Sequence, residues 1–267
     1  MAISPSDEFI EIDGTKLECR FFGKAPSEAP TLVLLHEGLG SVALWKGFPE
    51  ALAEATGLSV FAYSRAGYGK SDPVPLPRPL TYMHDEATMV LPKLLDAVGI
   101  HRGIFLGHSD GASIATIYTG SIQDHRVRGL LLLAPHFFVE DVTVASIRQA
   151  RTDFDTGSLR ERLAPYHNDV DAAFNGWADA WLDPDFRDWS IEDALAHIRV
   201  PTHIIQGLDD KYGTQAQADM AIEEAYSPVD VSYLPNCGHS PHHEKSGETI
   251  ALVEAFLERL DAMEPAA

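Results

Sequence analysis

Short runs of Val, Ile, Leu and Phe alternate along the chain with longer segments in which apolar residues recur at helical spacing. Strands buried on both faces of a parallel sheet have such continuous apolar runs, whereas the helices that cover them are amphipathic. The pattern therefore predicts an α/β fold with a mostly parallel central sheet flanked by helices. The predicted strands cover residues 31–36, 58–63, 103–106, 130–133, 203–206 and 231–234, and the predicted helices cover residues 45–55, 81–98, 109–120, 214–225 and 246–262.

Two segments depart from this alternation. Residues 9–13 and 16–22 flank the dipeptide Asp13-Gly14, which is typical of a tight turn, so we expect an antiparallel hairpin at a sheet edge. Between residues 135 and 201 no run resembles a buried strand. We interpret residues 136–200 as a helical cap inserted after the sixth strand, and residues 1–135 and 201–267 as the core. The alternative is a second independent domain, but about 60 residues bury only a marginal core.

Charge and cysteine content narrow the classes of partner and location. The 267 residues include 20 Lys and Arg against 40 Asp and Glu, which gives a formal net charge of −20. Phosphate backbones and anionic lipids repel such a chain, so we expect no nucleic-acid partner and no membrane partner. Two cysteines are too few for a disulfide framework, and the amino terminus lacks the regions of a signal peptide, which predicts a cytoplasmic location. The oligomeric state stays open.

The main candidate for chemistry is the pentapeptide Gly107-His108-Ser109-Asp110-Gly111. Its G-x-S-x-G pattern lets a strand turn sharply into a helix while the serine hydroxyl is exposed. An apolar run precedes the pentapeptide and small and apolar residues follow it, as a strand–turn–helix setting requires. Ser109 is therefore the predicted nucleophile.

A serine hydroxyl needs a base near neutral pH, and that base needs an acid to orient it. His239 follows the predicted strand at 231–234, and both Asp209 and Asp210 follow the predicted strand at 203–206. The chain order is thus Ser, Asp, His. With this order and the pentapeptide around Ser109, the chain resembles the α/β-hydrolase family from about residue 8 to residue 262, most weakly across the cap.

The resemblance implies which residues complete a catalytic triad with Ser109. The acid in that family commonly stands three residues after the glycine that closes its strand, which favours Asp210 over Asp209. The step Gly238-His239 resembles the Gly-His step that the family has before its last helix. His239 is therefore the implied general base, and Asp210 the implied acid.

The resemblance also implies an oxyanion hole made of backbone N–H groups. The family takes one donor from the residue after the nucleophile and one from the loop after the third strand. Here these are Asp110 and Gly38, with Leu39 as the alternative to Gly38, because Glu37 stands where the family usually has glycine. Two carboxylates near a developing negative charge disfavour it unless they are paired or turned away.

Arg65 is a candidate partner for the Glu37 carboxylate. It opens a segment that resembles the Arg-Gly-x-Gly-x-Ser loop of the family, after the strand adjacent to the oxyanion loop. We therefore predict an ion pair between Arg65 and Glu37. The alternative is an arginine that only caps local backbone carbonyls.

Four residues are predicted to shape a substrate pocket. Leu39 belongs to the oxyanion loop, His136 follows the sixth strand, and Trp177 and Trp181 stand four residues apart on one face of a predicted helix. Packing inside the cap is the alternative role of the tryptophans, and a structural role is the alternative for His136. We expect no metal site, because the cluster at His242 has no matching ligands elsewhere.

These residues predict a cofactor-free serine hydrolase that cleaves a small carboxylic ester or related acyl compound through an acyl-enzyme. Its partner would be a small-molecule acyl substrate. Lactone hydrolysis, carbon–carbon bond hydrolysis, amide cleavage and perhydrolysis would use the same triad, because the pocket and not the fold selects the reaction. The alternative from another class is a non-catalytic protein that binds a small ligand on the same fold.

Overall fold

The computed structural model describes residues 8–26 and 30–263. Residues 1–7, which contributed to the argument against a signal peptide, lie outside the described residues, and the location stays a prediction. Eight strands form one sheet in the order β1-β2-β4-β3-β5-β6-β7-β8. Their bounds are β1 Phe9–Ile12, β2 Thr15–Gly23, β3 Thr31–Leu35, β4 Ser59–Tyr63, β5 Gly103–His108, β6 Val127–Leu133, β7 Thr202–Gly207 and β8 Val229–Leu234.

The strands pair as the hydrophobic pattern predicts. β1 and β2 form the antiparallel hairpin at the sheet edge, and Asp13 and Gly14 between them both have positive φ. β2 is also antiparallel to β4, whereas the pairs from β4 through β3, β5, β6 and β7 to β8 are parallel. All parallel strands therefore end at the same edge of the sheet.

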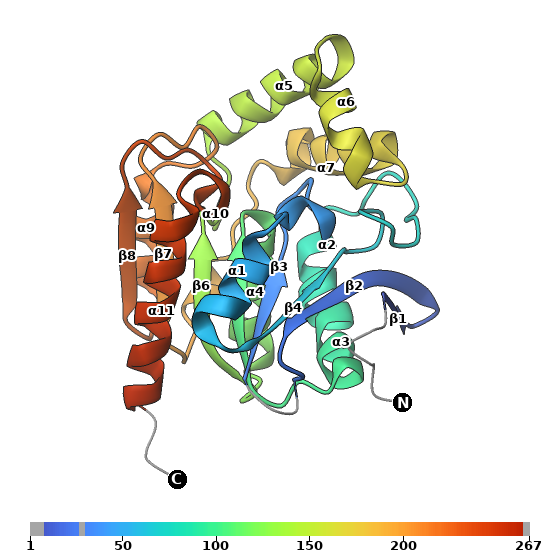
Figure 1. Cartoon of the computed structure of the whole chain (residues 1–267). Coiled ribbons are helices and arrows are strands. Elements are labelled where there is room, and N and C mark those ends of the chain that lie inside the picture. The colour runs from blue at the N-terminus through green and yellow to red at the C-terminus, as the bar shows by residue number, and fades with distance from the viewer. Residues whose placement is uncertain (1–7, 27–29, 264–267) are drawn as a thin grey trace.

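Alternate residues of the central strands build two separate hydrophobic layers, because successive side chains point to opposite faces of a sheet. Leu34 and Leu106 pack with helices α1 (Phe48–Thr56) and α11 (Ser246–Met263) on one face. Leu35 and Phe105 pack with α4 (Asp110–Ile122) on the other. Figure 1 shows α1 and α11 on one side of the sheet and α4 on the other. The remaining α-helices outside the segment between β6 and β7 are α2 (Tyr82–Asp85), α3 (Leu91–Val98), α9 (Gln215–Glu224) and α10 (Pro241–Glu244).

Prolines change two of the predicted helices. The predicted helix at 81–98 is divided into α2, a π-helical turn at Glu86–Val90, and α3. Pro92 has no N–H to donate, and its ring displaces the carbonyl four residues earlier. The backbone therefore forms a π-helical turn, which contains one residue more than an α-helical turn would. The predicted helix at 45–55 begins later, at Phe48, because Lys46 has a φ of 53° and Pro49 stands in the first helical turn.

Four α-helices and two short 3-10 helices occupy the chain between β6 and β7. The α-helices are α5 (Asp141–Thr156), α6 (Leu159–Leu163), α7 (Val170–Leu182) and α8 (Glu192–Leu195), and the 3-10 helices cover Ala164–Tyr166 and Pro184–Phe186. Figure 1 shows α5, α6 and α7 beyond the ends of the parallel strands, on the side where the loops after β7 and β8 lie. Phe174 and Trp181 from α7 belong to the same hydrophobic cluster as Phe105 of β5. Within the described residues, no helix has the length and apolarity that a membrane span requires.

Candidate active site

Ser109 lies at a sharp turn between β5 and α4. Its backbone has φ 53° and ψ −118°, a strained conformation for a residue with a side chain. Gly111 is required by close packing, because a Cβ there would stand 1.9 Å from the carbonyl oxygen of Leu35. A Cβ at Gly107 would stand 2.4 Å from the carbonyl oxygen of Gly111. The two glycines thus permit the turn that places the Ser109 hydroxyl at the carboxyl edge of the sheet.

The structure brings Ser109, His239 and Asp210 together from the loops after β5, β8 and β7. His239 Nε2 lies 3.0 Å from Ser109 Oγ, and His239 Nδ1 lies 2.8 Å from Asp210 Oδ2. A carboxylate only accepts hydrogen bonds, so Nδ1 of the histidine carries the proton that Asp210 binds. Nε2 of the neutral ring is then free to accept the proton of the serine hydroxyl.

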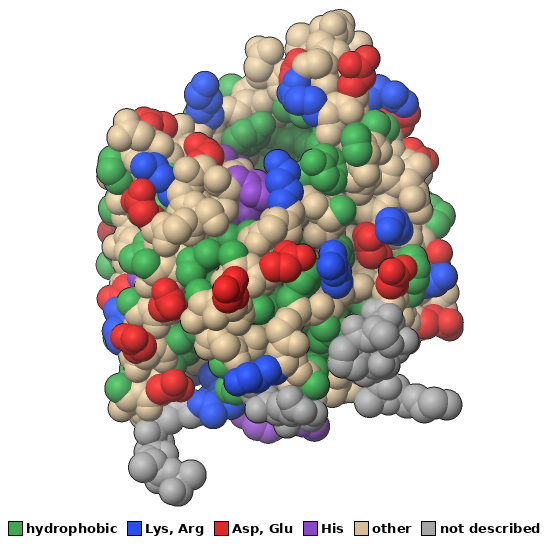
Figure 2. Space-filling view, viewed as in Figure 1, with side chains coloured by type: hydrophobic (Ala, Val, Ile, Leu, Met, Phe, Trp, Pro, Cys, Tyr) green, Lys and Arg blue, Asp and Glu red, His purple; other side chains and the backbone are tan. Residues whose placement is uncertain are grey.

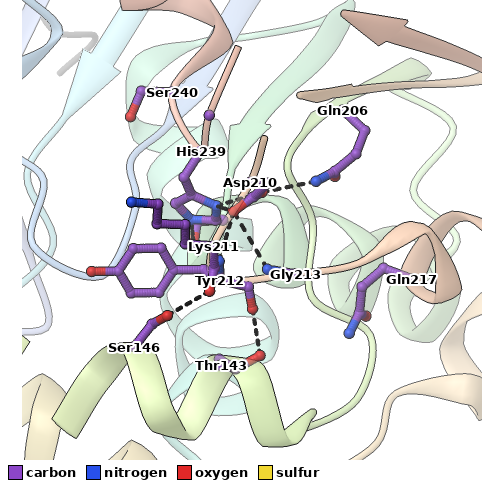
Figure 3. A network of polar contacts seen from close by, with 12 residues as sticks. Thr143, Ser146, Gln206, Asp210, Lys211, Tyr212, Gly213, Gln217, His239 and Ser240 are labelled. Carbon is purple, nitrogen blue, oxygen red and sulfur yellow. Dashed lines mark hydrogen bonds and ion pairs between the residues drawn. The ribbon is translucent and has the colours of Figure 1, made fainter. Parts of the chain in front are cut away.

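Asp210 is held by several donors besides His239. The N–H groups of Tyr212 and Gly213 donate to Oδ1 at 2.7 and 3.4 Å, and Gln206 Nε2 donates to Oδ2 at 2.8 Å (Figure 3). Burial alone would raise the pKa of Asp210, but the hydrogen bond from His239, and the positive charge of His239 when it is protonated, hold that pKa below its usual value. Asp209 is exposed instead, so of the two aspartates the geometry favours Asp210.

The oxyanion loop follows β3, and its shape depends on Arg65. The guanidinium of Arg65 donates to the carbonyl oxygens of His36 and Glu37, at 2.5 and 2.9 Å. The predicted ion pair between Arg65 and the Glu37 side chain is therefore wrong. The physical reason is that the planar guanidinium matches two successive carbonyls of the adjacent loop, while the Glu37 side chain turns toward His108.

Both carboxylates next to Ser109 have partners. Glu37 Oε2 lies 3.5 Å from His108 Nδ1, and Asp110 Oδ2 accepts a hydrogen bond from the Tyr82 hydroxyl at 2.5 Å. Burial would raise the pKa of Glu37, but the contact with His108 holds it well below its usual range. Burial raises the pKa of Asp110, and the charge of Arg65 only partly opposes this. Paired carboxylates repel a developing oxyanion less than isolated ones do.

A cavity of about 230 Å³ opens beside Ser109. Figure 2 shows a hollow beneath the upper helices, with hydrophobic side chains on its walls and a histidine at its edge. The predicted pocket residues Leu39, His136, Trp177 and Trp181 all line it, as do Gly38 and Asp110 of the predicted oxyanion hole. Small-molecule sites usually have volumes of about 300–1,000 Å³, so this cavity suits a small substrate.

His136, Trp177 and Trp181 line the cavity and also pack against neighbouring residues. The His136 ring lies 5.5 Å from the ring of His239 and 5.3 Å from the ring of Trp181. Burial, followed by the charge of His239, lowers the pKa of His136 to about 3, so this imidazole is neutral near pH 7. Trp177 packs so closely on Gly38 that a Cβ there would stand 2.1 Å from its Nε1.

Sequence reasoning missed the residues that connect the site to its surroundings. Trp181 Nε1 donates to the Tyr82 hydroxyl at 3.0 Å, which makes Tyr82 the link between α7 and Asp110. Thr143 and Ser146 of α5 donate to the carbonyl oxygens of Tyr212 and Lys211, directly after Asp210 (Figure 3). The only sequence signal for Tyr212 was its place two residues after the acid.

Other candidate chemistry finds no support in the geometry. The His242 ring is buried and packs 4.8 Å from the ring of Trp45, and the described residues contain no group of three His, Cys, Asp or Glu arranged around a metal ion. Burial raises the pKa of Cys237 to about 11, which keeps the thiol protonated and a poor nucleophile.

Comparisons with known proteins found similar chains. Among curated proteins, the proline iminopeptidase of Lactobacillus helveticus is 24% identical over 273 residues, which cover 88% of this chain and 92% of that protein. A solved structure from a study of carboxylesterases of Nitrososphaera gargenis aligns with a TM-score of 0.76 at 17% identity, over 95% of this chain and 99% of the other. The proline iminopeptidase structure from Mycobacterium smegmatis aligns with a TM-score of 0.75 at 19% identity, over 95% and 98% of the two chains.

At these identities the two solved structures show a shared fold, and they confirm the predicted sheet flanked by helices. A model of the alpha/beta hydrolase family matches residues 32–252, which is most of the chain. The protein therefore belongs to the alpha/beta hydrolase family.

Proposed function

We propose that the protein is a serine hydrolase that cleaves a small acyl compound with the triad Ser109, His239 and Asp210. The observation that carries this proposal is the unbroken chain of contacts from Ser109 Oγ to His239 Nε2 at 3.0 Å and from His239 Nδ1 to Asp210 at 2.8 Å. The imidazole accepts the serine proton as the hydroxyl oxygen attacks the acyl carbon. Asp210 then stabilises the imidazolium that forms.

The oxyanion of the tetrahedral intermediate lies between two loops in this proposal. The backbone N–H groups of Asp110 and Gly38 donate to it, with Leu39 as the alternative to Gly38. The imidazolium returns its proton to the leaving group, which leaves an acyl-enzyme on Ser109. His239 next activates a water molecule that hydrolyses this ester, so every proton transfer uses a side chain of the chain and no cofactor is required.

The cavity is consistent with a small carboxylic ester as the substrate. Its volume is below the usual range for drug-sized ligands, and its walls are mostly apolar and aromatic. We assign residues 136–200 to a helical cap, because α5 and α7 contribute Thr143 and Trp177 to these walls. Lactone, carbon–carbon bond and peroxide chemistry share the triad and differ only in what the cavity admits.

A second candidate is cleavage of an amide whose substrate carries an ammonium group. Asp110 Oδ1 is buried without a hydrogen-bond partner, and no Lys or Arg of the described residues lines the cavity. A bound cation would favour the ionised form of this buried carboxyl. Two of the relatives are named proline iminopeptidase, which is compatible with this candidate.

A fluorophosphonate probe tests the proposal. We expect it to label the purified protein, and we expect Ser109→Ala to abolish labelling while the exposed Ser158→Ala retains it. Absence of labelling in the wild type would favour the non-catalytic binding protein. A set of matched esters, lactones and anilides, each with a free and an acetylated amino group, then separates the two candidate substrates. Asp110→Asn lowers kcat/KM only for the free amines if the second candidate is correct.

A further inference from the structure

His167 lies between α6 and α7 and contacts two loops of the core. Its Nδ1 accepts a hydrogen bond from the N–H of Gly69 at 3.0 Å, and its Nε2 lies 2.9 Å from the carbonyl oxygen of Leu39. The residue is 8% exposed, and its ring packs edge-on against that of Tyr68, with the ring centroids 6.0 Å apart. Because Leu39 belongs to the oxyanion loop, His167 joins the segment 136–200 directly to that loop.

These two contacts determine the tautomer of His167. A backbone N–H only donates, so Nδ1 presents its lone pair to Gly69, and a carbonyl oxygen only accepts, so Nε2 carries the proton and donates it to Leu39. Burial lowers the pKa of His167, although the hydrogen bond to Leu39 and the charges of Glu37 and Glu18 oppose this. The imidazole is therefore neutral near pH 7, and the neutral ring with its proton on Nε2 satisfies both contacts.

Gly69 is held in place independently of the His167 side chain. It has a φ of 57°, and a Cβ there would stand 2.2 Å from Glu18 Oε2, so glycine lets this carboxylate approach. Glu18 Oε2 in turn accepts a hydrogen bond from the N–H of Lys70 at 3.0 Å. The N–H of Asn168 donates to the Gly69 carbonyl at 2.8 Å, which places the backbone next to His167. Gly69 is thus a firm support for the imidazole.

His167 and Arg65 hold the oxyanion loop on either side of its candidate donors. Arg65 donates to the Glu37 carbonyl at 2.9 Å, and His167 donates to the Leu39 carbonyl. In a planar trans peptide the C=O and N–H groups point in opposite directions, so the direction of the Glu37 carbonyl determines that of the Gly38 N–H. The N–H groups of Gly38 and Leu39 lie between the two held carbonyls. Arg65 therefore orients the peptide before these donors, and His167 the peptide after them.

We propose that His167 is a positioning residue that couples the cap to the oxyanion hole by holding the Leu39 carbonyl. This inference rests on the proposed function, because it concerns the N–H groups that stabilise the tetrahedral intermediate. Such donors are effective when they are oriented before the negative charge develops. His167 therefore supports kcat more than substrate binding, and it makes the oxyanion hole depend on the placement of the segment 136–200.

Two substitutions separate the Leu39 contact from the Gly69 contact. In His167→Gln the amide nitrogen stands near the place of Nε2 and still donates to Leu39. In His167→Asn the shorter side chain has its amide oxygen near the place of Nδ1, where it accepts from Gly69 but leaves the Leu39 carbonyl without this donor. We expect His167→Asn to lower kcat about 10- to 100-fold with little change in KM, since misplacing a group by about 1 Å costs up to about 10²-fold.

His167→Gln should recover most of this loss. The exposed His197→Asn changes a histidine of the same segment and is the matched control, with the wild-type kcat. A wild-type kcat in His167→Asn would overturn the proposal. Equal losses in the two His167 variants would also overturn it, because each breaks one contact and a residue that only anchors the cap would not distinguish them.

A trifluoromethyl ketone tests the oxyanion hole more directly. Ser109 Oγ adds reversibly to its carbonyl carbon, and the adduct carries a negative oxygen like that of the tetrahedral intermediate. The inhibition constant should rise in His167→Asn by about the factor by which kcat/KM falls, because both quantities measure how well that oxygen is stabilised. An unchanged inhibition constant beside a lowered kcat would overturn the proposal.

A spectroscopic measurement separates this inference from the proposed function. In ¹⁵N-histidine-labelled Ser109→Ala protein at pH 7, we expect His167 to carry a proton on Nε2 and none on Nδ1. The resonances are assigned by their absence after His167→Gln is added. A proton on Nδ1 would overturn the inference even in an active enzyme. Failure of the triad chemistry would show itself differently, as a wild-type protein that no fluorophosphonate labels.

Discussion

Two histidine–carboxylate pairs stand side by side at the carboxyl edge of the sheet. Asp210 and His239 are 2.8 Å apart, and three further donors hold the carboxylate. Glu37 and His108 are 3.5 Å apart. Nε2 of His239 faces the Ser109 hydroxyl, whereas Nε2 of His108 faces a backbone carbonyl. The group that faces Nε2 therefore decides whether the imidazole of such a pair can act as a base.

The largest expected effect tests which pair contains the base. Ser109→Ala or His239→Gln should lower kcat by on the order of 10⁴ to 10⁶, because nucleophile and base act as one unit. His108→Leu should lower kcat far less, because Nε2 of His108 faces a backbone carbonyl and not the Ser109 hydroxyl. Steady-state kinetics on a small ester, with circular dichroism as a check of folding, measure the difference. Equal losses for His239 and His108 variants would remove the distinction between the pairs.

The next effect tests the carboxylate of the first pair. Asp210→Asn should lower kcat by on the order of 10³ to 10⁴, because the amide no longer selects the tautomer with a proton on Nδ1. Asp209→Asn changes an exposed neighbour and should alter kcat less than about threefold. Kinetics of the two variants under the same conditions decide between them. A greater loss in Asp209→Asn would contradict the assignment of the acid.

His136 is a third histidine at the site, and it is buried without a paired carboxylate among the described residues. Its effect on the pH dependence of stability therefore contrasts with that of the two pairs. The pKa of His136 is lowered to about 3, chiefly by burial, so the unfolded chain binds its proton more tightly at any pH between that value and about 6.5. The free energy of unfolding should therefore fall as pH drops below about 6.5, by up to about 1.4 kcal/mol per pH unit for this group. His136→Gln should show a shallower decline in urea unfolding between pH 6.5 and 4.5. The exposed His125→Gln should not.

The smallest expected effect is a change in the free energy of unfolding at low pH, where the carboxylates become protonated. The pKa values of Asp210 and Glu37 are both lowered by their histidines, although burial opposes this. The stability that each pair contributes is thus present above about pH 4 and is lost as pH falls further. Relative to the wild type, Asp210→Asn and Glu37→Gln should each flatten the loss of stability between pH 5 and pH 3, by on the order of 1 kcal/mol. Parallel curves would show that the contacts are absent in solution.

Sequence reasoning predicted those parts of the molecule whose structure depends on residues that are close together in the chain. Continuous apolar runs identified every parallel strand of the sheet, and Asp13-Gly14 identified the hairpin turn. The position of Ser109 at a strand end followed from the glycines that its tight turn requires, whereas His239 followed from its place after a predicted strand and from the resemblance to the family. These features depend on a few neighbouring residues, so they are visible without coordinates.

The parts that could not be predicted depend on side-chain direction between distant segments. Nothing near Arg65 in the chain shows that its guanidinium meets two carbonyls and not a carboxylate. Tyr82 stands 28 residues before Asp110 in the chain, and only the folded arrangement shows that its hydroxyl reaches that carboxylate. Helical spacing identified the shared face of Trp177 and Trp181, but not that one of them presses on Gly38.

Because of the contact between Trp177 and Gly38, a substitution at either position depends on the residue at the other. With tryptophan at 177, a methyl group at 38 has no room, so drift toward larger residues at 38 is blocked until 177 becomes smaller. A smaller residue at 177 would both widen the cavity and relax the loop that carries Gly38, the proposed oxyanion donor of that loop. Directed evolution of this enzyme for bulkier acyl groups should therefore randomise positions 38 and 177 jointly, since neither alone explores the useful combinations.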